Sequence, residues 1–240
     1  ANPTVPPYPS KPKSSFVSSI YADHKNQLWV CTNNGLYLYN DLKDNFKPFL
    51  HDDSNTNSIK YDGITSIIQD HSGVYWIGFF AHGFQCYDAE INTFFNLKLN
   101  VPFKENAYVF NIIEDADNNI WLGLDRGLVK INSARNKYVT YFAKKNNVNG
   151  LSNDAIQCMF LDKQKQLWFG TKNGLNLYQP KTNTFKKYFR ENGLYSDYIY
   201  SLAQDINGNI WIGSVNGLSI LNPTTDKINF FEGLSATTIY

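Results

Sequence analysis

The sequence predicts an all-β fold built from repeated four-stranded units, and three observations lead to this prediction. The five Trp residues recur at intervals of about 43 to 47 residues along a chain of 240. Each Trp lies in the same context, a short apolar run bounded by turns rich in Asn and Gly. The apolar runs also lack the i, i+3, i+4, i+7 spacing of an amphipathic helix. Because self-similarity at about 40 to 50 residues is typical of propeller blades, we expect a β-propeller.

An Asp placed six residues before each Trp gives the repeat its phase. The pairs are Asp23 and Trp29, Asp70 and Trp76, Asp115 and Trp121, Asp162 and Trp168, and Asp205 and Trp211. The Asp opens the loop between the first two strands, where its carboxylate can accept backbone N–H groups as in an Asx turn. Each Trp is expected to pack between neighbouring blades, with its indole N–H donated to an acceptor. Catalysis needs one asymmetric constellation, so five identical pairs indicate architecture.

The fourth unit shows how a repeat divides into strands. Its apolar runs are Ala155–Leu161, Gln166–Thr171, Gly174–Tyr178 and Thr184–Phe189. Four short strands joined by tight turns match one propeller blade. Two residues after the Trp comes a Gly, replaced by Cys31 in the first unit, and this small position fits a crowded approach of neighbouring sheets. These glycines are Gly78, Gly123, Gly170 and Gly213.

The predicted organisation is a Pro-rich lead-in at residues 1–15 followed by a propeller at residues 16–240. Residues 233–240 repeat the beginning of a further unit, with Gly233-Leu234 followed by Ile239. We therefore expect five blades plus the start of a sixth, within a seven-bladed propeller; a closed five-bladed ring is the alternative. The blades are placed near residues 16–58, 59–103, 104–150, 151–193 and 194–232.

The composition excludes several classes of function. Lys and Arg number 22 against 21 Asp and Glu, and the charges are scattered. Without a basic stripe to hold a phosphate backbone, no nucleic-acid partner is expected. The apolar runs are of strand length, so no membrane segment is expected in this chain.

The Cys and His residues indicate neither a cofactor nor a metal. The Cys residues fall at different places in three units, which predicts buried free thiols. They are Cys31, Cys86 and Cys158. The His residues lie in different predicted turns, and no two have the spacing of metal ligands. They are His24, His51, His71 and His82.

Two stretches carry a recognisable signature. They are Asp205-Ile206-Asn207-Gly208-Asn209-Ile210-Trp211-Ile212-Gly213-Ser214, continued by Asn216-Gly217-Leu218, and Leu167-Trp168-Phe169-Gly170-Thr171-Lys172-Asn173-Gly174-Leu175. Both closely resemble the two-component regulator propeller repeat, and the resemblance covers about residues 16–240 in five copies. The departures are Cys31 in place of Gly, an inserted residue in Phe79–Gly83, and Asp125-Arg126.

The resemblance implies the periplasmic sensor region of a hybrid histidine kinase of Bacteroidetes. Such regions typically contain two seven-bladed propellers, a small β-sandwich and a membrane helix, followed by cytoplasmic kinase and regulator domains. In gut Bacteroidetes they commonly sense glycan fragments. This chain carries none of the kinase or regulator sequence, so no enzymatic activity is expected of it.

Positions that break the repeat are the candidates for function, because repeated positions serve architecture. The turns between second and third strands, and the loops leading into each next blade, are expected on one face. The second unit there carries Phe79, Phe80 and His82, and the third carries Asp125 and Arg126. Aromatic faces and a forked guanidinium suit the C–H faces and hydroxyls of a sugar. The loops leading into blades add Tyr61, Tyr108 and Tyr198.

Alternative interpretations stay open for these residues. Phe79 and Phe80 could fill a widened turn or a blade interface, and Arg126 could be a solvated charge or could pair with Asp125. For the whole chain we expect a non-catalytic periplasmic sensor that binds an oligosaccharide or other small molecule. Its further partners would be other blades or a second propeller of the same parent protein, and a second copy in a homodimer. The alternatives are a propeller lyase or hydrolase, with His82 as general base and Arg126 stabilising negative charge, or a purely structural protein-binding propeller.

Overall fold

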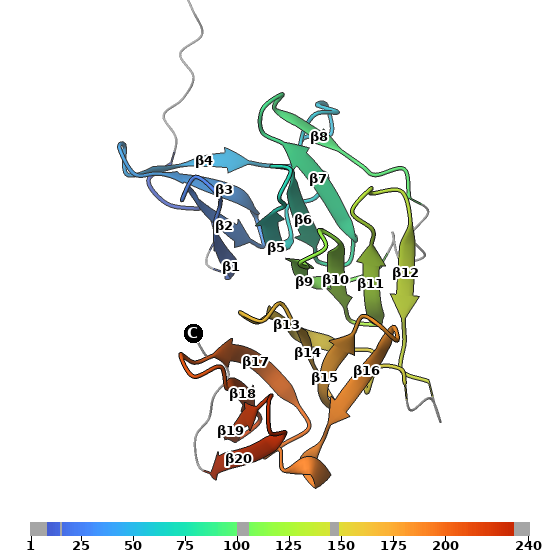
Figure 1. Ribbon diagram of the computed structural model, residues 1–240. Coiled ribbons are helices and arrows are strands. Elements are labelled where there is room, and N and C mark those ends of the chain that lie inside the picture. The colour runs from blue at the N-terminus through green and yellow to red at the C-terminus, as the bar shows by residue number, and fades with distance from the viewer. Residues whose placement is uncertain (1–8, 15, 100–105, 145–148, 233–240) are drawn as a thin grey trace, which may run out of the picture. The chain divides into compact units, whose positions relative to one another are not determined.

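A computed structural model describes residues 9–14, 16–99, 106–144 and 149–232 (Figure 1). Most of the lead-in, the expected start of a sixth blade at 233–240 and the segment 100–105 lie outside these residues. The chain forms two compact units, residues 1–109 and 110–240, and each is described by itself.

The first unit contains two four-stranded sheets (Figure 1). The first sheet consists of β1 (Val17–Ala22), β2 (Leu28–Thr32), β3 (Gly35–Asn40) and β4 (Asn45–Phe49). The second consists of β5 (Ile64–Gln69), β6 (Tyr75–Phe79), β7 (Phe84–Asp88) and β8 (Thr93–Phe95). In both sheets the strands lie in chain order.

The second unit contains three more sheets of the same order. The third blade has β9 (Val109–Glu114), β10 (Ile120–Leu124), β11 (Gly127–Ile131) and β12 (Tyr138–Tyr141). The fourth has β13 (Ile156–Leu161), β14 (Leu167–Thr171), β15 (Gly174–Gln179) and β16 (Thr184–Tyr188). The short 3-10 helix η1 (Arg190–Asn192) leads to β17 (Ile199–Gln204), β18 (Ile210–Ser214), β19 (Gly217–Asn222) and β20 (Lys227–Glu232).

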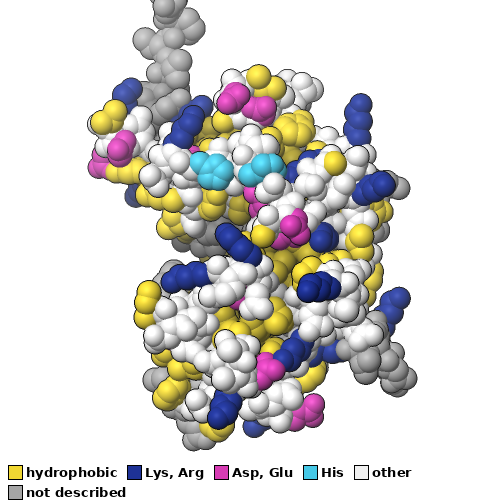
Figure 2. All heavy atoms as spheres, viewed as in Figure 1, with side chains coloured by type: hydrophobic (Ala, Val, Ile, Leu, Met, Phe, Trp, Pro, Cys, Tyr) yellow, Lys and Arg dark blue, Asp and Glu magenta, His cyan; other side chains and the backbone are white. Residues whose placement is uncertain are grey.

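The prediction of an all-β chain of antiparallel four-stranded blades is confirmed. All five sheets are antiparallel meanders in chain order, and the described residues contain no α-helix. In the fourth blade each strand begins and ends within one residue of the range expected from the sequence. No helix in the described ranges is long and apolar enough to cross a membrane. Lys and Arg side chains are interspersed with Asp and Glu on the visible surface (Figure 2).

The repeated Asp holds both its own turn and the Trp of the next strand. In the first blade, Asp23 Oδ1 accepts the backbone N–H groups of Lys25 and Gln27, each at 2.9 Å. Asp23 Oδ2 accepts the indole N–H of Trp29 at 2.9 Å. The same indole-to-carboxylate bond spans 2.8, 2.7, 2.9 and 3.0 Å in the other four blades. One carboxylate therefore supplies the Asx turn and the indole acceptor that the sequence predicts.

Trp side chains join neighbouring blades within each unit. Trp29 lies with its ring centroid 4.8 Å from that of Tyr75 in the second blade. Trp121 lies 5.4 Å from Phe169 in the fourth blade, and Trp168 packs in one cluster with Ile199 of the fifth. These three indoles are at most 2% exposed. The predicted packing of Trp between blades is therefore present in both units.

The Gly two residues after the Trp permits the close approach of blades that the sequence predicts. A Cβ placed on Gly123 would lie 2.8 Å from Ile156 Cγ2, and one on Gly170 would lie 2.7 Å from Ile199 Cγ2. Both Ile residues open the next blade. The three Cys residues are buried free thiols, as expected. Burial raises the pKa of Cys31 and Cys158 to about 12, so these thiols stay protonated near neutral pH.

Candidate functional site

In the first four blades, a repeated backbone hydrogen bond joins the turn between the second and third strands to the loop leading into the next blade. The Gly N–H of the turn donates to a carbonyl oxygen of that loop at 2.6 to 3.0 Å. The prediction that these two sets of loops share one face is therefore confirmed within each unit. The bonds run from Gly35 to Asp62, Gly83 to Ala107, Gly127 to Asp154 and Gly174 to Asp197.

On this face of the second blade, three rings form a stack. The ring of Tyr61 lies 3.7 Å from that of His82, centroid to centroid, with 11° between the planes. The imidazole of His51 lies 6.3 Å from the Tyr61 ring at 27°. The Lys60 ammonium lies 5.4 Å from the centroid of the Tyr61 ring. His51 and His82 are exposed and Tyr61 is half-buried, so the stack is held by the protein and open to a ligand.

His51 is fixed in this position by three hydrogen bonds. Its backbone N–H donates to Asp62 Oδ1 at 2.8 Å. Its ring Nδ1 lies 2.9 Å from the Ile59 carbonyl oxygen, and Nε2 lies 3.0 Å from Asp53 Oδ1. The Ile59 carbonyl, followed by Asp53, raises the pKa of His51 because both acceptors favour an imidazolium with two N–H groups. The contacts of His51 therefore favour its protonated form, which is paired with the Asp53 carboxylate.

Phe79, which the sequence predicts as a ligand contact, is instead a core residue. It is the last residue of β6, it is fully buried, and its ring meets that of Tyr61 edge-on at 5.6 Å. The sequence placed Phe79 in the turn, but the turn begins one residue later, at Phe80. The last position of this strand is buried in other blades too, where Thr32 and Thr171 occupy it. Phe79 therefore supports Tyr61 from below.

Phe80 and Tyr108 form a separate aromatic pair at the same end of the first unit. Phe80 is 56% exposed, and its ring meets that of Tyr108 edge-on at 4.4 Å. The backbone N–H of Phe80 donates to the Gly63 carbonyl oxygen at 2.9 Å, which ties the turn to the loop that carries Tyr61.

In the second unit, Asp125 and Arg126 pair with each other. Arg126 Nη2 donates to Asp125 Oδ2 at 3.1 Å, and Nε lies 3.3 Å from both carboxylate oxygens. The ion-pair interpretation is therefore the one that the geometry supports, although the Arg126 side chain stays 49% exposed. Tyr198 lies elsewhere in this unit, with its ring 4.6 Å from that of Tyr200.

Sequence reasoning missed His51, although a signal for it exists. Asp62 and Asp154 each accept the backbone N–H of the residue eleven positions earlier, which is His51 in one case and Ala143 in the other. Aligning the repeats on these two Asp residues places an imidazole where another blade has a methyl group. His51 therefore breaks the repeat in the same way as His82.

The geometry suits binding better than acid–base chemistry. A general base needs a partner that orients it. Within the described part of the chain, the ring nitrogens of His82 make no hydrogen bond, and its contact is the flat stack on Tyr61. The same residues contain no group of three His, Cys, Asp or Glu side chains arranged to hold a metal ion.

Comparison with known families identifies the repeat itself. Residues 11–34, 150–173 and 196–216 match the family model of the two component regulator propeller. The chain contains two-component regulator propeller repeats. The matched segments cover parts of the first, fourth and fifth blades, including the Asp–Trp pairs that begin at Asp23, Asp162 and Asp205. No curated protein matches the sequence.

Solved structures share the fold of these propeller repeats. The extracellular domain of a putative hybrid two component system from B. thetaiotaomicron has a TM-score of 0.75 and 19% identity, over 93% of this chain and 29% of that one. PorZ, a surface component of the type-IX secretion system of Porphyromonas gingivalis, has a TM-score of 0.63 and 16% identity, over 98% and 41% of the two chains. A chain of the mitotic checkpoint complex has a TM-score of 0.67 and 12% identity, over 97% and 72%. The present chain thus spans less than a third of the B. thetaiotaomicron domain.

Proposed function

We propose that the chain is the ligand-binding part of a periplasmic sensor in a hybrid two-component signalling protein, and that it binds glycan fragments without transforming them. The propeller repeats and the fold shared with the B. thetaiotaomicron extracellular domain support the sensor assignment. The observation that carries ligand binding is the ring stack of His51, Tyr61 and His82, which stands where the repeat is broken.

The stack has the chemistry that a sugar ring needs. The C–H face of a pyranose packs on a flat aromatic surface, and its hydroxyls need donors and acceptors at the edge of that surface. The exposed imidazole of His82 offers a face and two ring nitrogens. Lys60 adds an ammonium beside the Tyr61 ring. Phe79 fixes Tyr61 from below, so little side-chain entropy is lost when a ligand binds.

A sensor must couple binding to a change of state. The ligand can do so by binding one arrangement of the parent protein more tightly than another. The other blades of a seven-bladed ring, a second propeller and a second copy of the chain are the partners proposed for this coupling. In the second unit, the half-exposed guanidinium of Arg126 is proposed as an additional ligand contact on its own blade.

Calorimetric titration with a library of glycan fragments tests the proposal. We expect a saturable hit that His82→Ala and Tyr61→Ala each weaken about tenfold or more, since each removes one face of the stack. His24→Ala is the matched control, because His24 is an exposed His in the turn between β1 and β2, outside the stack. Arg126→Ala tests the third blade separately. A hit that survives both stack variants would refute the site, and glycan products detected by mass spectrometry would refute a non-catalytic sensor.

A further inference from the structure

The third blade carries a charged side chain where the other four blades are apolar. In β11, Lys130 pairs directly across from Trp121 of β10. A lysine at an apolar position is costly unless its ammonium has a partner. The residues that face the Trp in the other blades are Leu38, Cys86, Leu177 and Ile220.

The ammonium of Lys130 is largely withdrawn from water, and within the described residues it has a long ion pair to Asp115 but no hydrogen bond. Its side chain is 21% exposed, and Nζ lies 5.0 Å from the Trp121 ring centroid and 5.2 Å from that of Tyr178. The nearest carboxylate oxygen, Asp115 Oδ2, lies 3.9 Å away, beyond hydrogen-bond distance. That carboxylate already accepts hydrogen bonds from Trp121, from the side chain of Asn119 and from two backbone N–H groups. Within the described residues, the Lys130 ammonium therefore keeps its N–H groups for another acceptor.

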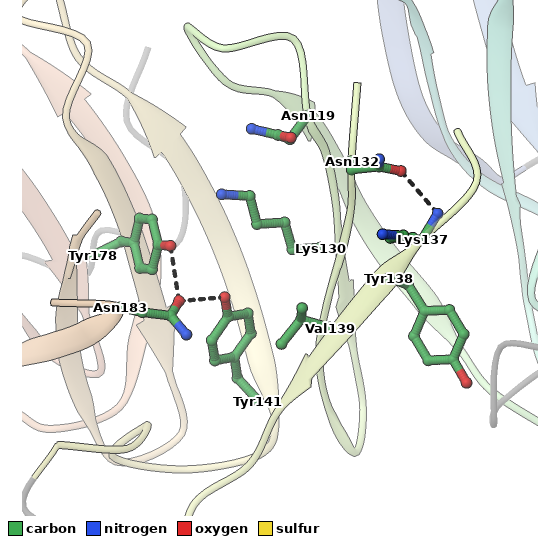
Figure 3. Close-up of a pocket in the computed structure, with 9 residues that line it drawn as sticks. All are labelled: Asn119, Lys130, Asn132, Lys137, Tyr138, Val139, Tyr141, Tyr178 and Asn183. Atoms are coloured by element: carbon green, nitrogen blue, oxygen red, sulfur yellow. Dashed lines mark hydrogen bonds between the residues drawn. The ribbon is translucent and has the colours of Figure 1, made fainter. Parts of the chain in front are cut away.

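Lys130 lines a pocket of about 280 Å³ between the third and fourth blades (Figure 3). The pocket lies at the end of β11 away from Arg126, so it is separate from the loops of the candidate site. Its lining combines Tyr, Asn and Lys side chains with Val139 and contains no carboxylate. Figure 3 shows the Lys130 side chain extending toward Tyr178. The exposed Lys137 adds a second positive charge to the lining.

A second donor is oriented by the tyrosines of the pocket. Asn183 Oδ1 accepts the hydroxyl hydrogens of Tyr141 at 2.6 Å and Tyr178 at 2.9 Å (Figure 3). This arrangement occupies the carbonyl oxygen of the amide, and in the described part of the chain the NH₂ group of Asn183 makes no hydrogen bond. The two phenol oxygens keep lone pairs that can accept hydrogen bonds from a ligand.

We propose that this pocket binds a uronic-acid residue, which is a single hydroxylated ring bearing a carboxylate. Lys130 would receive the carboxylate, the amide of Asn183 and the phenol oxygens would bind ring hydroxyls, and Tyr141 would contact the C–H face. The volume of about 280 Å³ lies just below the usual range for ligand pockets, about 300–1,000 Å³, and suits one ring. An amino acid or peptide end would add an ammonium, which Lys130 and Lys137 repel and no lining carboxylate receives. The proposal does not depend on the proposed function of the ring stack.

The indole N–H resonances provide a direct test, because the chain has five Trp residues and Trp121 lies beside Lys130. Glucuronate is titrated into the ¹⁵N-labelled chain, with glucose and acetate as separate controls. We expect a saturable shift of the Trp121 resonance with glucuronate, and much weaker responses to the neutral sugar and to the simple anion. A Trp121 resonance that does not move, or that moves equally with glucose or with acetate, would overturn the proposal.

Two variants copy residues that other blades already use, so both are expected to fold. Lys130→Leu reproduces Leu177. Asn183→Asp reproduces Asp226, which has the same left-handed turn conformation (φ 57° against 55°) and accepts the hydroxyl of Tyr188 at 2.8 Å. Each should weaken glucuronate binding about tenfold or more. Lys130→Leu removes a donor to the carboxylate, and Asn183→Asp adds a negative charge to the pocket.

The exposed Lys163 provides the matched control, and Lys163→Leu should leave glucuronate affinity unchanged. Unchanged affinity in both pocket variants would assign any glucuronate binding to another surface and overturn the proposal. An acidic peptide that displaces glucuronate at lower concentration would assign the pocket to a protein partner, which would also overturn it.

Discussion

Replacing Trp168 by Phe should destabilise the chain far more than the same replacement at Trp211. Both indoles donate to the Asp six residues earlier, at 2.9 and 3.0 Å. Trp168 is fully buried and its acceptor Asp162 is 2% exposed, whereas Trp211 is only partly buried. At Trp168 the smaller ring leaves a buried carboxylate oxygen without its donor, which costs about 1.5–3 kcal/mol. The lost part of the indole adds roughly 2 kcal/mol of apolar burial.

The expected loss at Trp168 is thus about 3.5–5 kcal/mol, a large part of the roughly 5–15 kcal/mol that stabilises a typical domain. At Trp211, water can reach the acceptor, so we expect less than half of that loss. Urea denaturation followed by far-ultraviolet circular dichroism measures both variants against the parent chain. Equal losses, or a loss below about 1 kcal/mol for Trp168→Phe, would refute the view that the buried indole-to-carboxylate bond holds the ring that packs against the next blade.

Three further predictions concern packing and protonation. Gly123→Ala should lower the free energy of unfolding by about 1–3 kcal/mol, because the new methyl group would meet Ile156; an unchanged Tm would contradict this. The side-chain donors Trp211 and Asn209 lower the pKa of Asp205 from 3.8 to about 2, so its contribution to stability is present above pH 3.8 and is lost toward pH 2. Between these pH values, the Asp205→Asn variant should therefore lose less stability than the parent chain in acid titrations. Superimposable curves of stability against pH for the two chains would contradict this contribution of Asp205. The raised pKa of His51 means that its contribution is present below the ordinary value of 6.5 and is lost as the pH rises through the folded value. Asp53→Asn should lower that pKa in an NMR titration, and a parent value at or below 6.5 would disprove the assigned contacts.

The blades could be predicted from the sequence because their determinants are local and repeated. The bond from Asp162 to Trp168 spans six residues, and the turn it closes is shorter still. Five copies of such a pattern reinforce one another, so strand limits in the fourth blade follow to within one residue.

The candidate sites depend on contacts that local patterns do not contain. His51 reaches Tyr61 because Asp62 closes the loop between them, and the path of that loop is not periodic. Phe79 was misjudged because a single residue decides whether a side chain ends a buried strand or begins an exposed turn. The pocket at Lys130 needs Tyr178 from another blade, 48 positions further along the chain.

The bond between Asp and Trp also bears on how such a chain can grow by duplication. The acceptor that orients each indole belongs to the same blade as the indole, only six residues away. A copied blade therefore brings its docking ring already aligned and needs from its neighbour only an apolar surface and a small residue. Gene duplication can add a blade of this kind without a matching change elsewhere, which leaves the remaining turns free to diverge toward different ligands.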